Sequence, residues 1–128
     1  MTSKFFSSII VLFLTVNGWS FHFDQNPDWC ENNNIRGIEV KISEKYSVEA
    51  VQFKNSFCDD SYLINFIRYW PIGEGEGTYF SLKYGIVEGY DGGPYPAVLP
   101  TFIKRFEYFT TELIVVPVAV VFAIKIPI

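Results

Sequence analysis

The amino-acid sequence predicts an all-β, mainly antiparallel fold: a small β-sandwich or barrel of about five to seven strands after an N-terminal signal peptide. Three observations predict it. Apolar and polar residues alternate in several stretches, as they do in strands with one buried face. Glycine- and proline-rich segments separate these stretches, and none has a convincing amphipathic helical period. Aromatic residues, which favour strands, make up 19% of the chain.

Residues 1–20 have the layout of a secretory signal peptide. A single cationic side chain, Lys4, precedes an apolar run over 5–16, and the small residues Gly18 and Ser20 offer cleavage positions. Two other interpretations are an uncleaved membrane anchor and a buried N-terminal strand. An anchor needs about 20 predominantly apolar residues, more than this run contains.

The remaining residues, 21–128, are predicted to form a single β-rich domain. Residues 24–37 are polar and turn-rich, and they predict an extended leading segment. Residues 38–43 alternate strictly between apolar and polar side chains, which predicts a half-buried strand with one wet face. Residues 46–53 predict the next strand, with a bulge near 50–51 that would bring its apolar residues to a common face.

Two further strands are predicted to pair as a hairpin. Residues 62–70 are rich in aromatic and β-branched side chains, and residues 78–87 alternate with four apolar residues on one face. The connection over 71–77 contains three glycines, which predicts a long, mobile tip.

The last third of the domain contains the most ambiguous segments. Residues 88–100 include three prolines and predict a loop, and residues 101–111 fit a strand or a short helix. The 16 residues of 113–128 are rich in valine and isoleucine, which favours one central strand buried on both faces. Contact of this run with a membrane is the alternative, although it is shorter than a spanning helix.

Charge and cysteine content limit the compartments and the classes of partner to be expected. The formal net charge is −4 and the basic residues are scattered, which argues against nucleic-acid binding and against anionic lipid head groups. The leader predicts a secreted or periplasmic protein, in which Cys30 and Cys58 would form a disulfide bond. With one histidine and no closely spaced cysteine pair, no metal site and no cofactor are expected.

The sequence offers little for catalysis, and no catalytic residue is assigned. His22 is the only histidine and lies next to the expected cleavage position, so no triad can be built on another one. The carboxylate pairs Glu74/Glu76 and Asp59/Asp60 resemble the acid–base pair of a glycoside hydrolase only in residue type. A carboxylate-based hydrolase therefore stays a minor alternative.

Aromatic residues near loops and strand ends favour a binding role, because exposed Tyr and Trp are common recognition anchors. The predicted binding residues are Trp70, Glu74, Glu76, Tyr79, Tyr90, Asp91 and Tyr95. They predict an exported, disulfide-closed domain that binds a protein or carbohydrate, preferentially a basic one, as an inhibitor, immunity factor, adhesin or effector would. The alternative from another class is a small membrane-associated protein that uses its hydrophobic C-terminal run. The oligomeric state is not predicted.

Overall fold

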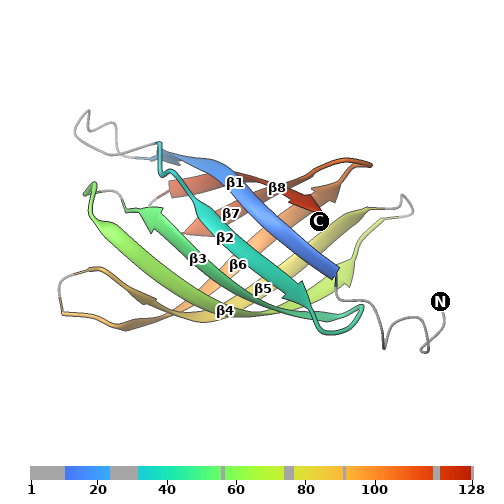
Figure 1. The fold of residues 1–128 in the computed structure, drawn as a ribbon, viewed down its shortest axis with the longest axis horizontal. Coiled ribbons are helices and arrows are strands. Elements are labelled where there is room, and N and C mark those ends of the chain that lie inside the picture. Colours follow the sequence, from blue (N-terminus) through green and yellow to red (C-terminus); the bar gives the residue numbers. More distant parts are fainter. Residues whose placement is uncertain are drawn as a thin grey trace.

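The protein is a closed antiparallel β-barrel (Figure 1). The computed structural model describes residues 11–23, 32–55, 57–73, 77–90, 92–116 and 119–127. Each strand pairs with its neighbours in sequence, and the first pairs with the last. The strands are β1 (Val11–His22), β2 (Arg36–Lys41), β3 (Tyr46–Lys54), β4 (Asp60–Pro71), β5 (Thr78–Glu88), β6 (Tyr95–Arg105), β7 (Thr110–Val116) and β8 (Ala119–Pro127). No helix in the described part of the chain is both long and apolar enough to cross a membrane.

The all-β, antiparallel prediction is confirmed, but the expected number of five to seven strands is too low, since the described residues form eight. One strand lies in the predicted leader, where a buried strand was only an alternative. Another begins in the predicted loop and ends in the segment expected to be a strand or a short helix, and the C-terminal run holds two strands where one was expected.

Strand β1 closes the barrel. It pairs with β2 from Val11 to Thr15 and with β8 from Phe13 to His22, with an irregularity between Thr15 and Asn17. Cleavage after Gly18 or Ser20 would remove most of this strand. The signal peptide therefore stays a prediction. A mature chain that had lost it would lack most of β1 and could not form this closed barrel.

Strands β2 and β3 show the alternation that their sequences predict, but with opposite polarity. Glu39 and Glu49 pair with each other and are buried inside the barrel, whereas the apolar Ile38 and Val48 lie on the outer surface. The expected wet face is thus the interior face. The bulge expected near residues 50–51 is absent, because the pairing of β3 with both neighbours runs through it without a shift.

The C-terminal third is more regular than predicted. The predicted loop over 88–100 is shorter, because β6 begins at Tyr95 and pairs with β5 through Pro96 and Pro100. Pro96 pairs with Ile86 and Pro100 with Leu82, and the pairing of β5 with β6 continues on either side of both prolines. The C-terminal run is not one central strand but two antiparallel ones, β7 and β8.

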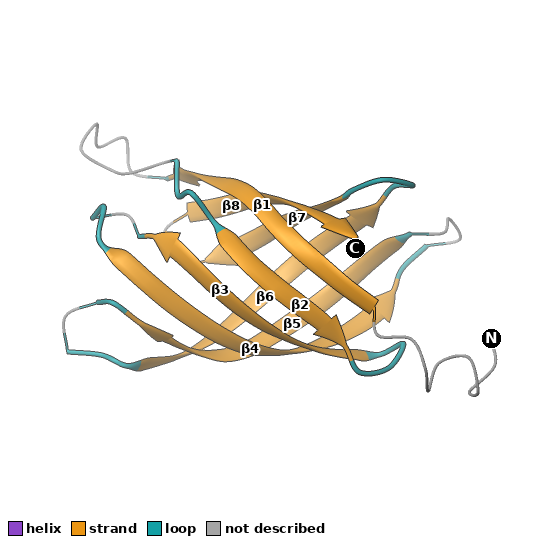
Figure 2. Cartoon of the chain, viewed as in Figure 1, coloured by secondary structure: helices purple, strands orange, loops and turns teal. Residues whose placement is uncertain are grey.

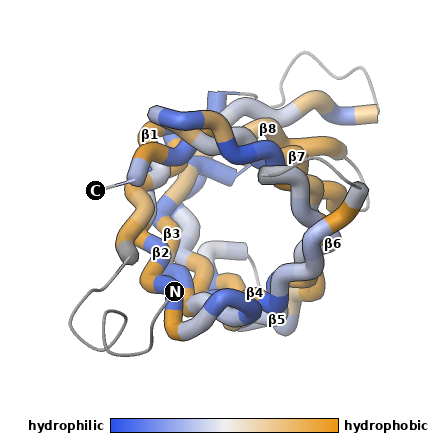
Figure 3. The backbone as a smooth tube through the Cα atoms, turned by 90° about the vertical axis from the view of Figure 1, so that its right-hand side faces the viewer, coloured by the Kyte–Doolittle hydropathy of each residue, from blue (hydrophilic) through white to orange (hydrophobic). Residues whose placement is uncertain are grey.

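The connections alternate between the two ends of the barrel (Figure 2). Val11 and Pro127 lie at one end, with the turns around 42–45, 72–77 and 106–109; we call this the terminus end. The other four connections form the opposite end, which we call the loop end. Hydrophilic and hydrophobic residues alternate along the strands around the ring (Figure 3). We divide the interior into a terminus half and a loop half after these ends.

Candidate functional site: an ion-pair network beneath an apolar cavity

Five ionisable side chains meet inside the barrel. Glu39 comes from β2, Glu49 from β3, Lys83 from β5, Glu112 from β7 and Lys125 from β8. None of them is more than 3% exposed. Each occupies an inward position of its strand, so the period of two that places apolar residues outside also brings these groups to the barrel axis.

Lys125 is the centre of this network. Its Nζ lies 2.6 Å from Glu39 Oε1, 2.5 Å from Glu49 Oε2 and 2.9 Å from Glu112 Oε2. A buried ammonium group with three carboxylate partners uses all three of its hydrogens.

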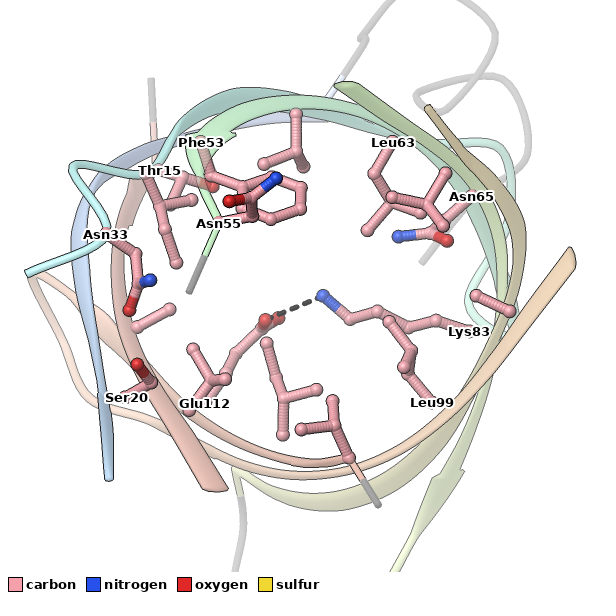
Figure 4. Close-up of a pocket in the computed structure, with 18 of the residues that line it drawn as sticks. Thr15, Ser20, Asn33, Phe53, Asn55, Leu63, Asn65, Lys83, Leu99 and Glu112 are labelled. Atoms are coloured by element: carbon pink, nitrogen blue, oxygen red, sulfur yellow. Dashed lines mark hydrogen bonds and ion pairs between the residues drawn. The ribbon is translucent and has the colours of Figure 1, made fainter. Parts of the chain in front are cut away.

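Lys83 joins the same carboxylates from the opposite wall. Its Nζ lies 2.7 Å from Glu112 Oε1 and 3.1 Å from Glu49 Oε1, and Figure 4 shows Lys83 and Glu112 pointing toward each other. Two carboxylates are therefore shared between two lysines. A buried ion pair needs this kind of mutual coordination to offset the loss of hydration.

Neutral side chains complete the network. The Tyr69 hydroxyl donates to Glu39 Oε2, and Asn65 Nδ2 donates to Glu49 Oε1 over 2.9 Å. Toward the terminus end, Lys41 Nζ lies 4.3 Å from the centre of the Tyr69 ring, and the Arg105 guanidinium lies 5.1 Å from the same ring centre. Cations over an aromatic face are stabilised by the ring quadrupole, and here they fill the terminus half of the barrel.

The three carboxylates form a geometric candidate for a metal site. Glu39, Glu49 and Glu112 each place one oxygen within 4.8 Å of the others. The Lys125 ammonium contacts all three of them, however, and a divalent cation would have to displace it. The arrangement fits an ion-pair network better than a metal centre.

A cavity of about 330 Å³ occupies the loop half of the interior. Its floor is the ion-pair network, represented by Glu49, Lys83, Glu112 and Lys125. Its walls are aliphatic and aromatic side chains from β3 to β8, which include Val51, Phe53, Leu63, Val87, Leu99, Ile114, Val116 and Val121. Phe53, Leu63 and Leu99 point inward in Figure 4. These wall side chains stay only half-buried although they point inward, because the space between them is empty of protein atoms.

Polar residues line the cavity where it approaches the loop end. Asn55 is held by its own contacts: its amide donates to Ser61 Oγ and Gly89 O, and its carbonyl accepts from two backbone amides. Tyr90 lies beside it on the β5–β6 connection, where burial raises the pKa of its phenol. Tyr90 therefore stays protonated and neutral across the physiological pH range.

The structure separates the residues predicted to form one binding surface. Trp70 lies on the outer wall and stacks with Phe80, and Tyr79 lies inside against Tyr69, with ring centres 6.0 Å apart. Tyr90 lies beyond the other end of β5, and Tyr95 begins β6 opposite Val87 near that end. The described parts of the 71–77 and 88–100 segments are thus at opposite ends of the barrel and do not form one surface.

Cys58 lies on the β3–β4 connection, where its backbone amide donates to Asn55 O over 2.9 Å. The remaining predicted site residues are Cys30, Glu74, Glu76 and Asp91, and all of them lie outside the described residues. The predicted Cys30–Cys58 disulfide bond and the binding role of the loops therefore stay predictions.

Sequence reasoning missed the five residues of the network. The alternation over 38–43 predicts that Glu39 faces water, because polar positions in an alternating strand normally do, and no role was predicted for the other four residues. One sequence signal indicates the true orientation. In β4 and β5 the apolar residues that alternate with the inward positions are mostly large aromatic or branched side chains, such as Ile64, Phe66 and Tyr84. Had those residues been assigned to an outer surface, the charged positions would have fallen inside.

No protein-family model matches this chain, and no curated protein was found as a relative.

Proposed function

We propose that this chain is a membrane-spanning β-barrel whose interior is closed to ion flow. The observation that carries the proposal is the inverted polarity of the wall, with ionised groups at the axis and large apolar side chains on the outside. A bilayer selects this arrangement, because lipid solvates apolar side chains while a closed ladder satisfies every strand's backbone groups.

The outer wall of β4 illustrates the apolar band. Its outward residues between Asp60 and Arg68 are Tyr62, Ile64 and Phe66, and Ile64 is 68% exposed. A soluble protein rarely leaves a contiguous patch of this kind in water. The band continues around the barrel through exposed residues of six other strands, which include Phe21, Ile38, Val48, Tyr84, Ile86, Val98, Phe102 and Leu113.

Charged residues mark the limits of the band. The outward-facing charges of the described strands lie toward strand ends: Arg36, Lys54, Asp60 and Glu88 toward the loop end, and Arg68 and Lys104 toward the terminus end. A tilted strand crosses a bilayer with about 9–11 residues. Strands β1, β4, β5 and β6 have 11 or 12 residues and meet this length, whereas β2 and β7 are shorter, with 6 and 7.

Aromatic side chains gather near these limits. At the terminus end the rings of Trp70, Phe80 and Phe102 form a contiguous group, with centres 5.9 Å and 5.4 Å apart along the series. The Arg68 guanidinium lies 5.1 Å from the Trp70 ring. Amphipathic aromatic residues and arginine are typical of membrane–water interfaces.

The interior argues against a pore. The five-group network and the Tyr69 ring fill the terminus half, where Ile67, Tyr69 and Ile103 are at most 2% exposed. An eight-strand barrel is just wide enough for side chains to fill it. Ion conductance in planar bilayers is therefore expected to stay at background.

A lysine substitution on the outer wall tests the proposal. Ile64→Lys places a charge midway between Asp60 and Arg68, and it should destabilise the vesicle-inserted protein by about 2–4 kcal/mol. Glu88→Lys, at the limit of the band, should change stability by about 1 kcal/mol or less. Both are measured by urea titration of the full chain in phospholipid vesicles, followed by tryptophan fluorescence.

The proposal is overturned if the wild-type chain folds as a monodisperse protein without lipid or detergent and Ile64→Lys costs no more than Glu88→Lys. The intact mass of the folded protein determines whether residues 11–20 are retained, as closure through β1 requires.

A further inference from the structure

We propose that the cavity in the loop half binds a small, uncharged, hydrophobic molecule. This inference needs the closed barrel but does not rest on the membrane proposal, since the cavity lies wholly inside the wall.

The size of the cavity suits a small molecule. Its volume of about 330 Å³ lies at the lower end of the range for ligand sites, roughly 300–1,000 Å³. Barrels of eight strands either fill their interior with side chains or hold one small ligand. Here the terminus half follows the first pattern and the loop half leaves room for the second.

The apolar walls favour a hydrocarbon ligand. Val51, Leu63, Leu99, Ile114 and Val121 come from five different strands and present their branched side chains to the same space. Apolar surface in contact with water costs about 25 cal/mol per Å², and an apolar occupant removes that cost.

The floor excludes a charged ligand. Two lysines and two glutamates line it, and each of them already contacts an opposite charge within the network. A ligand charge placed beside the apolar walls would lose its hydration without gaining a free counter-ion. Uncharged polar side chains also line the cavity, among them Asn55 and the neutral Tyr90 near the loop end and Thr15 and Asn65 deeper inside, so the ligand can carry an uncharged polar group.

Methyl NMR of the folded full chain with 1-naphthol as the probe tests this inference. We expect saturable shifts of the inward methyl groups of Leu63, Leu99 and Val121. The outward methyl groups of Val98 and Leu113 report non-specific association of the probe with the outer wall, and they should not saturate in parallel. Naphthalene-1-sulfonate and 1-naphthylmethylammonium should bind about tenfold more weakly or worse.

Leu99→Phe fills the cavity and should weaken 1-naphthol binding about tenfold or more. Val98→Phe adds a ring at the adjacent position on the outside of the wall and should leave binding unchanged. Ala97→Leu is a second filling variant, to be used if Leu99→Phe does not fold.

Three results would overturn the inference. They are the absence of saturable inward shifts in the folded wild-type protein, equal binding of a charged analogue, and equal loss of binding in Val98→Phe and Leu99→Phe. None of them bears on the membrane proposal, whose test is the stability of Ile64→Lys.

Discussion

The two halves of the barrel interior are built from the same alternating strands but are packed in opposite ways. In the terminus half the inward side chains are long. Lys83, Lys125 and Tyr69 contact the carboxylates of the network, and Arg105 lies over the Tyr69 ring. In the loop half they are mostly valine, leucine, isoleucine and alanine, which are too short to meet across eight strands. Closure fixes the width of the barrel, and side-chain length then decides whether its interior is solid or hollow.

The comparison also separates two kinds of stabilisation. The network holds its strands together by mutual coordination of buried charges, which contributes little net free energy when complete but is costly to break. The cavity walls contribute ordinary apolar burial that is incomplete, because their inward surfaces stay accessible. Substitutions should therefore be far more damaging in the terminus half.

The largest effect is expected from Lys125→Met. It leaves three buried carboxylates with Lys83 as the single remaining lysine partner in the described network, and we expect a loss of about 3–5 kcal/mol in the free energy of unfolding. The control is Lys104→Met, whose exposed ammonium donates to Thr78 Oγ1, and it should cost about 1 kcal/mol or less. Urea unfolding of both variants in vesicles measures the difference; equal losses would contradict a structural role for the network.

A matched pair of aliphatic truncations compares the packing of the two halves directly. Ile67→Ala removes a side chain with 0% exposure and should cost about 2–5 kcal/mol, because it creates a new cavity. Leu99→Ala enlarges a cavity that exists already and should cost clearly less, about 1–2 kcal/mol. The same unfolding assay applies, and a larger loss for Leu99→Ala would show that the loop half is packed in solution.

The smallest effect is expected from removing single hydroxyl groups. Tyr69→Phe keeps the ring but deletes the donor to Glu39, which retains its contact with Lys125, so we expect a loss of about 1–2 kcal/mol. Tyr90→Phe, at the edge of the cavity, should change stability by about 0.5 kcal/mol or less. A double-mutant cycle of Tyr69→Phe with Lys125→Met should show coupling, and strictly additive losses would argue against a shared network.

The sequence by itself determined that the chain is made of strands and where most of them lie. The local signals are the alternation over 38–43 and 78–87 and the branched residues of 113–128. The structure has strands there, namely β2, β5, β7 and β8. Local patterns of this kind depend only on the two-residue period of a strand, so no knowledge of the partner strands is needed.

Only the tertiary structure decided which face of each strand is inside. A period of two defines two faces of a strand but does not say which of them meets the interior. In the barrel closed through β1, the face that carries Glu39, Glu49, Lys83, Glu112 and Lys125 lies inside. The site itself depends on contacts far apart in the chain: Glu39 and Lys125 are separated by 86 positions and meet because the first and last strands pair. No local pattern encodes such a contact, since it exists only when all eight strands have closed the ring.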